Sequence, residues 1–260
     1  GVKIAVAYDS SCATPLFYAE YPGSIVDVPQ LCFMVNKANG YGYKNIGFIL
    51  DRGYFSETNI LEMDSLGYGF VMMFKGKKAL VRSYIDKVRG IFENSFDTRI
   101  QEYGVNGTTL YEPVFPSDVR NGRKRYIHLY YSDAKASSER RILWEKIARM
   151  TSALEEMYNR EYEPDGEYLR YFDFVFYEQK GKDGKTAKLL QAATAKKGVI
   201  EEELSYCGYY AILTSEKKTA EEALTLYKSR DVSEKLFRAD KTFLGESSPG
   251  AHGGNAPGEQ

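Results

Sequence analysis

Residues 46–56 read Ile46-Gly47-Phe48-Ile49-Leu50-Asp51-Arg52-Gly53-Tyr54-Phe55-Ser56. The first five residues are apolar apart from one glycine, which predicts a short strand buried on both faces. Asp51 follows at the carboxyl end of this strand, where α/β sheets place their ligand sites. Gly53 permits a sharp turn, and Ser56 can cap a helix that reaches Leu66, with Gly67 beyond its end. The stretch therefore predicts a strand, a carboxylate and a helix in an α/β layer.

The flanking segments extend this pattern. Residues 2–8 and 14–20 are strand-like and are separated by small polar residues, which predicts a hairpin. Apolar residues recur at helical spacing within 29–39, and residues 69–74 and 209–214 are again strand-like. This alternation of strands and helices predicts an α/β fold class with a layered sheet.

A long uninterrupted helix is predicted over residues 219–241, because the stretch holds no Gly or Pro. Tyr227, Arg230, Glu234 and Lys241 lie on it at offsets of 0, 3, 7 and 14 residues. At about 100° per residue these four side chains share an arc of roughly 60°. A carboxylate flanked by cations suits a site where the carboxylate holds a metal ion and its neighbours hold phosphates.

The spacing Tyr-x2-Arg-x3-Glu-x6-Lys resembles the YREK motif of the DDE transposases of the insertion-sequence-four group. The apolar strand ending in Asp51-Arg52-Gly53 resembles the second-aspartate motif of the same family. Residues 15–27 also resemble the family's segment of a strand followed by Pro-Gly-Asn, with Ser24 in place of the usual Asn. The resemblance spans about residues 1–244.

The resemblance implies a ribonuclease-H-like mixed sheet with a β-rich insertion between the second aspartate and the glutamate. We accordingly expect a first part of the core at residues 1–77 and the insertion at 78–205. The last strand and the catalytic helix would follow at 206–244. A disordered tail is predicted at 245–260, because Gly, Pro, Ser and Asn abound there and little apolar surface can be buried.

The resemblance also implies a reaction and its residues. It implies metal-dependent DNA strand cleavage and strand transfer at transposon ends, with two Mg²⁺ or Mn²⁺ ions. Asp51 and Glu234 would be catalytic metal ligands, and Tyr227, Arg230 and Lys241 would contact DNA phosphates. The implied partner is double-stranded DNA, bound by a homodimer, with no small-molecule cofactor. The implied location is the cytoplasm, at the nucleoid of a prokaryote.

The family's first aspartate has no clear counterpart. Asp9 lies in the predicted hairpin turn and Asp27 is read as a helix cap. We therefore expect an inactive fragment, incomplete at both ends, since the chain begins at Gly1 within a strand-like run. Two alternatives stay open: another ribonuclease-H-like metal nuclease, and a non-catalytic DNA-binding remnant.

Composition excludes several classes. Hydrophobic residues make up 43% and charged residues 27% of the 260 residues, as in ordinary globular proteins. No apolar run approaches the roughly 18 residues of a membrane span, so no membrane association is expected. The formal net charge is −1, so contact with nucleic acid requires local basic patches. Three distant cysteines fit free thiols.

Two basic segments are candidates for such patches. One is residues 75–89, and the other is a turn containing Arg120, Arg123, Lys124 and Arg125. Each can follow a DNA backbone or be a solvated loop. His128 alternates within a strand-like run and has no partner at ligand spacing, which indicates a structural role.

Overall fold

The computed structural model describes residues 2–9, 14–22, 33, 36, 40–42, 45–75, 79–181 and 186–231. The chain divides into two compact units. Unit 1 comprises residues 1–75, 111–126 and 212–260, and unit 2 comprises residues 76–110 and 127–211. The predicted insertion at 78–205 is therefore divided between the units, because residues 111–126 belong to unit 1.

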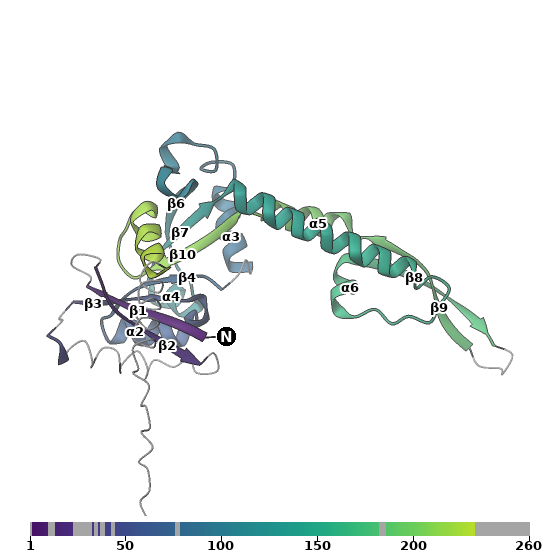
Figure 1. Ribbon diagram of the computed structural model, residues 1–260, viewed down its shortest axis with the longest axis horizontal. Coiled ribbons are helices and arrows are strands. Elements are labelled where there is room, and N and C mark those ends of the chain that lie inside the picture. The colour runs from purple at the N-terminus through teal and green to yellow at the C-terminus, as the bar shows by residue number, and fades with distance from the viewer. Residues whose placement is uncertain are drawn as a thin grey trace, which may run out of the picture. The chain divides into compact units, whose positions relative to one another are not determined.

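Unit 1 contains a mixed sheet, in which the described strands follow the order β2-β1-β3-β4-β10 (Figure 1). Strand β1 (Val2–Asp9) is antiparallel to β2 (Thr14–Pro22) and to β3 (Ile46–Leu50). Strand β3 is parallel to β4 (Gly69–Met73), which is antiparallel to the end of β10 (Tyr209–Thr214). The predicted hairpin, the predicted strands and the α/β class are thus confirmed.

The segment around β3 forms as its sequence predicts. All five residues of β3 are buried, which matches its continuous apolar run. A short 3₁₀ helix, η1 (Arg52–Tyr54), leads into α2 (Glu57–Ser65). The Ser56 hydroxyl accepts a hydrogen bond from the Asn59 backbone N–H at 3.2 Å. Gly67 follows the helix with a φ of +71°, a conformation that favours glycine.

The chain from residue 111 to residue 126 completes unit 1. It contains the end of β6 (Val105–Glu112), helix α4 (Pro116–Asn121) and the start of β7 (Arg125–Tyr131). Phe115 and Phe74 both pack against Phe55, with ring centres 5.8 and 4.7 Å away. This aromatic contact joins α4 to the turn between Asp51 and α2.

Unit 2 combines strands in the order β10-β7-β6-β5 with a separate hairpin of β8 and β9. Its longest described helix, α5 (Asp133–Glu155), has 23 residues. Its remaining elements are α3 (Ala79–Val88), η2 (Phe96–Thr98), β5 (Arg99–Ile100), η3 (Gln101–Tyr103), α6 (Gly166–Tyr171), β8 (Phe172–Lys180), β9 (Thr186–Ala195) and α7 (Lys197–Ser205).

The core around α5 explains why this helix and the β8–β9 hairpin fold together. Apolar residues on one face of α5 pack with residues of α6, β8, β9 and α7. The buried members of this cluster are Leu143, Ile147, Met150, Leu154, Tyr171, Phe172, Leu190 and Ile200.

The predicted β-rich character of residues 78–205 needs correction. The described part of this range holds strands β5–β9 but also helices α3–α7, so it is mixed. The short helices α4 and α6, of six residues each, span too few turns to show a clear helical period in sequence.

Three further predictions lie wholly or partly outside the described residues. Within the helix expected at 29–39, the structure describes Phe33 and Asn36, and both are helical. Within the helix expected at 219–241, residues 220–231 are helical. The tail expected at 245–260 lies outside the described residues.

Candidate functional site

Asp51 lies directly after β3, at the edge where β3 and its parallel neighbour β4 both end. Its carboxylate Oδ1 accepts a hydrogen bond from the Arg52 backbone N–H at 2.6 Å and caps η1. One third of the side chain is exposed. The second oxygen, Oδ2, has no hydrogen bond to a described residue. Oδ2 of Asp51 is therefore an acceptor that no described residue engages.

The helix at 220–231 supplies the other described members of the predicted site. Its start is fixed by a reciprocal pair of hydrogen bonds. The Glu222 carboxylate accepts from the Thr219 N–H at 2.7 Å, and the Thr219 hydroxyl accepts from the Glu222 N–H at 3.1 Å. Leu224 and Leu226 of this helix are buried.

Arg230 joins this helix to Asp51. Its Nη1 lies 3.7 Å from Asp51 Oδ1, and its Nη2 lies 3.3 Å from Asp231 Oδ1. The guanidinium carbon is 4.8 Å from the centre of the Tyr227 ring, within cation–π range. The structure thus brings together Asp51, Tyr227 and Arg230, three of the five predicted site residues.

The electrostatics keep Arg230 charged and Tyr227 neutral. Burial alone lowers the pKa of Arg230, but Tyr227, Asp231 and Asp51 outweigh it and raise the pKa above its ordinary value. Burial also raises the pKa of Tyr227, with a smaller contribution from Asp51 and against an opposing effect of Arg230. The site consequently places the Arg230 cation between the Asp51 carboxylate and the protonated phenol of Tyr227.

The guanidinium of Arg230 is incompletely bonded. Its Nε is buried and has no hydrogen-bond acceptor among the described residues. An arginine with spare donors is suited to bidentate binding of a carboxylate or phosphate. Asp231, which sequence reasoning did not single out, is the second acidic neighbour of this arginine, and its adjacency in sequence was the available signal.

Two of the predicted site residues, Glu234 and Lys241, lie outside the described residues, and so does Asp27. Within the described ranges, no group of three or more His, Cys, Asp or Glu side chains is close enough to hold a metal ion. The described contribution to the predicted metal site is therefore Asp51 alone.

Asp9 lies at the other end of β3 from Asp51. It pairs with Ile46, the first residue of β3, whereas Asp51 follows the last residue of that strand. Five residues of strand separate the two positions, a distance of roughly 16 Å at 3.3 Å per residue. The prediction that Asp9 lies in the hairpin turn needs correction, because Asp9 is the last residue of β1 and pairs with Thr14 and Ile46.

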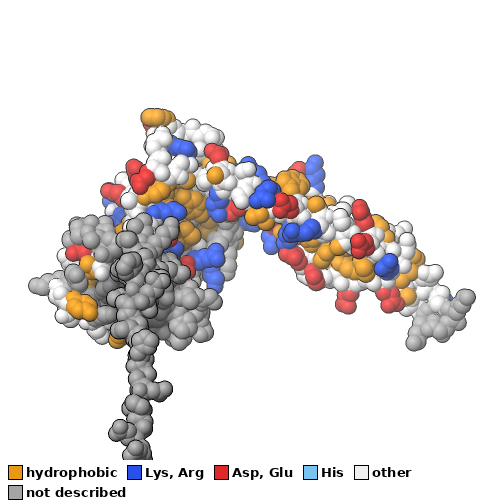
Figure 2. Space-filling view, in the orientation of Figure 1, with side chains coloured by type: hydrophobic (Ala, Val, Ile, Leu, Met, Phe, Trp, Pro, Cys, Tyr) orange, Lys and Arg blue, Asp and Glu red, His pale blue; other side chains and the backbone are white. Residues whose placement is uncertain are grey.

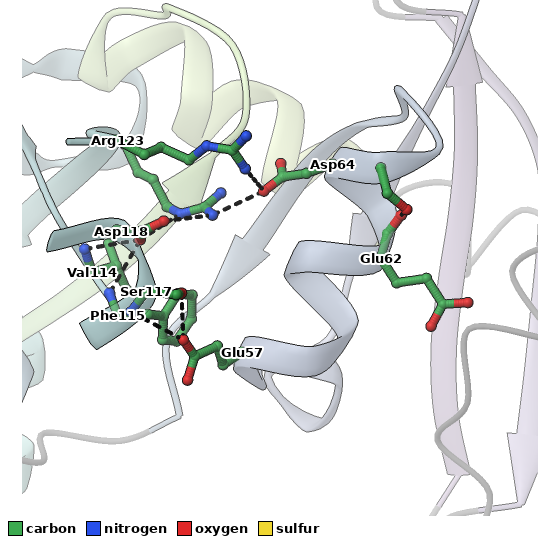
Figure 3. Close-up of polar contacts among 10 residues, drawn as sticks. Glu57, Glu62, Asp64, Val114, Phe115, Ser117, Asp118 and Arg123 are labelled. Atoms are coloured by element: carbon green, nitrogen blue, oxygen red, sulfur yellow. Dashed lines mark hydrogen bonds and ion pairs between the residues drawn. The ribbon is translucent and has the colours of Figure 1, made fainter. Parts of the chain in front are cut away.

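The basic turn before β7 is engaged within unit 1 (Figure 3). Arg125 donates from Nε to Asp118 Oδ2 at 2.7 Å and from Nη2 to Asp64 Oδ2 at 2.8 Å. Arg123 also reaches Asp64, at 2.5 Å. Figure 3 shows Asp64 on α2 directed at Arg123, and the Ser117 hydroxyl of α4 bonded to Glu57. Arg125 is buried and links α4 to α2, whereas Arg123 is exposed and also pairs with Asp64. A DNA contact of this turn stays a prediction.

Other cations of the predicted basic segments also have partners. In unit 2, Arg82 pairs with Glu202 at 3.0 Å and Arg89 pairs with Asp86 at 2.9 Å. Basic and acidic side chains are interspersed over the face drawn in Figure 2. His128 is fully buried and is bonded to the Thr109 hydroxyl at 2.8 Å, as its structural interpretation requires.

In comparisons with known proteins, the chain matches no family model, no curated protein and no solved structure. Among the residues that the structure describes, no helix has the length and apolar character needed to cross a membrane.

Proposed function

We propose that this chain is the catalytic domain of a DDE-type transposase, with a ribonuclease-H-like core that acts on duplex DNA at transposon ends. The mixed sheet of unit 1, with its parallel pair β3 and β4, is compatible with such a core. The proposal rests on residue chemistry and placement, since the fold class alone supports many functions.

One observation carries the proposal. Two motifs, chosen independently from distant parts of the sequence, supply side chains that meet in the folded chain, Asp51 and Arg230. A chance pair of motifs has no reason to converge on one sheet edge. The meeting point is also the carboxyl end of a buried strand, which is where α/β folds place their sites.

Each residue then has a proposed role. Asp51, through its free Oδ2, and Glu234 would hold a divalent cation, Mg²⁺ or Mn²⁺. In a two-ion site, bound metal would supply activation of the attacking oxygen and stabilisation of the leaving oxygen of an in-line phosphoryl transfer. Arg230 would bind the phosphate next to the scissile bond, and the cation–π contact with the Tyr227 ring would hold its guanidinium in place. Lys241 would contact a neighbouring phosphate.

The contact between Arg230 and Asp51 fits these roles. At 3.7 Å it is a long ion pair at a partly exposed site, and such pairs contribute little, about 0–1 kcal/mol. A DNA phosphate can therefore replace Asp51 as the partner of Arg230 at small cost. That exchange would leave the Asp51 carboxylate free to bind a cation.

Manganese binding in the presence of DNA tests the proposal. We would titrate Mn²⁺ into the full chain with a nicked DNA duplex and follow free Mn²⁺ by electron paramagnetic resonance. We expect Asp51→Asn to weaken Mn²⁺ binding by at least about tenfold, since it removes a charged ligand. Glu62→Gln is the matched control, because Glu62 is an exposed carboxylate on α2 that Figure 3 shows pointing away from the polar contacts.

Equal Mn²⁺ binding by the wild-type chain and Asp51→Asn would overturn the proposal. We expect weak or no DNA cleavage by the chain alone, because two carboxylates rather than three are assigned. Mn²⁺-dependent hydrolysis without strand transfer would instead favour a ribonuclease-H-like nuclease. DNA binding without any Mn²⁺ binding would favour a non-catalytic remnant.

A further inference from the structure

A polar pocket lies within unit 2 and shares no residue with the site at Asp51. It has a volume of about 240 Å³, and no aliphatic side chain lines it. It is formed by the loop after α3, the end of β7, α5, the end of α7 and the start of β10. The lining residues are Arg89, Gly90, Glu93, Asn94, Tyr131, Arg140, Ser205 and Tyr209.

The acidic group of this pocket, Glu93, accepts hydrogen bonds from the chain itself. It is buried, and its two oxygens accept hydrogen bonds from the Gly90 N–H at 2.9 and 3.0 Å. The Phe92 N–H adds a bond at 3.2 Å, and the Tyr209 hydroxyl adds one at 2.5 Å. A carboxylate has about four acceptor positions, and three donors engage Glu93, because the single Gly90 N–H is shared between its two oxygens.

Three other polar groups of the pocket have donors that no described residue engages, whereas the Ser205 hydroxyl donates to the Glu202 carbonyl at 2.7 Å. Arg140, Asn94 and the Tyr131 hydroxyl make no hydrogen bond or ion pair with a described residue. Arg140 and Asn94 are exposed, which opens the pocket to solvent. Arg89 adds a second positive charge, fixed by Asp86 and by the Tyr206 ring, whose centre is 4.4 Å from the guanidinium carbon. The lining holds two arginines and one carboxylate, so it favours an anion over a cation as ligand.

We propose that this pocket binds a phosphate group through Arg140, Asn94 and Tyr131. The volume is below the roughly 300–1,000 Å³ of pockets for drug-sized molecules, yet several times the ~30 Å³ that a water molecule occupies. It therefore suits a compact anion. Free phosphate and the phosphodiester of a DNA backbone share this chemistry, and the guanidinium of Arg140 matches both.

The test compares two adjacent arginines of α5. Arg140→Gln removes the proposed ligand, whereas Arg141→Gln removes an exposed arginine that pairs with Glu145 at 3.0 Å. Binding of inorganic phosphate would be measured by isothermal titration calorimetry. Binding of a short fluorescent DNA duplex would be measured by anisotropy. Both assays would contain EDTA, so that no metal site contributes and a failure of the proposed transposase function leaves the result interpretable.

We expect Arg140→Gln to weaken phosphate binding by about tenfold, and Arg141→Gln to leave it unchanged. A parallel loss of DNA affinity with Arg140→Gln would assign the pocket to a backbone phosphodiester. Unchanged DNA affinity would assign it to a free phosphate group. The proposal is overturned if the chain binds no phosphate in either form, or if the two variants behave alike.

Discussion

At the scale of single residues, Gly47 shows how the residue type at one position of β3 depends on a side chain of the neighbouring strand β1. Gly47 pairs with Tyr8 of β1, and the Tyr8 ring folds over it. A Cβ at position 47 would lie 2.3 Å from the nearest ring atom of Tyr8. Aromatic side chains that cover strand glycines in this way stabilise antiparallel pairs. The glycine within the apolar run of β3 is thus required by the buried tyrosine.

Gly47→Ala is expected to destabilise the chain by about 1–3 kcal/mol, because the tyrosine ring cannot move without displacing the packing around it. Urea unfolding followed by circular dichroism would measure the change. Tyr8→Ala combined with Gly47→Ala removes the clash, so the two changes should be strongly non-additive. Gly198→Ala is the control, since a Cβ there meets nothing within 4 Å. If Gly47→Ala and Gly198→Ala change the free energy of unfolding equally, the proposed overlap between a Cβ at position 47 and the Tyr8 ring is wrong.

At the scale of elements, the cluster of Asp64, Asp118 and Arg125 fixes α4 against α2 and the start of β7. Asp118 is 1% exposed and Arg125 is 5% exposed. Burial alone would raise the pKa of Asp118, but hydrogen bonds from Arg125 and from the Phe115 and Val114 N–H groups lower it below its ordinary value. A carboxyl group with a lowered pKa stabilises the folded state in its ionised form.

This cluster predicts a specific loss of stability in acid. The contribution of Asp118 is complete above the ordinary aspartate pKa of about 3.9 and is lost as the pH falls through the lower pKa of the folded state. Asp118→Asn should therefore cost about 3 kcal/mol or more at pH 7 and reduce the slope of stability against pH below about 4. Urea unfolding at a series of pH values would measure both effects.

Arg123→Ala is the matched control for this cluster, because Arg123 bonds to Asp64 but its side chain is 49% exposed. A change of at most about 1 kcal/mol is expected for such a surface pair. If Asp118→Asn keeps the acid dependence of the wild-type chain, another carboxyl group is responsible and the assignment to Asp118 fails.

The elements also show what the sequence could predict. Strand β3, the Ser56 cap and the end of α2 at Gly67 follow from local patterns of two to ten residues, and all three are confirmed. The partners of Arg125 could not be predicted, because Asp64 lies on a helix about sixty residues away and no short pattern links the two. The basic turn was therefore a candidate DNA-binding patch in the sequence. In the structure, two of its arginines, Arg123 and Arg125, form ion pairs with Asp64 and Asp118.

At the scale of the whole molecule, motif spacing predicted which distant residues meet, but it did not predict the division into units. The meeting of Asp51 with Arg230 follows from the resemblance. The placement of residues 111–126 in unit 1 depends on contacts of α4 with α2, which involve side chains whose pairing the sequence does not specify. The proposed phosphate pocket could not be predicted from the sequence either, because its lining residues come from five separate segments and no short pattern links them.

The charge of the whole chain makes a last prediction about DNA binding. The net charge is −1, and many of the described cations pair with carboxylates of the chain itself. Binding should then depend on a few phosphate contacts, with Arg230, Lys241 and Arg140 as the proposed cations. Each contact contributes about −0.9 to the slope of log affinity against log salt, so a slope between about −2 and −4 is expected.

Fluorescence anisotropy with a short duplex at several salt concentrations measures this slope, and individual variants assign it. Arg230→Gln should weaken binding and reduce the magnitude of the slope by about 1, because one phosphate contact is lost. Arg141→Gln should leave the slope unchanged, since that arginine pairs with Glu145. A slope near −8 in the wild-type chain would require a broad basic surface. It would contradict binding through a few localised phosphate sites.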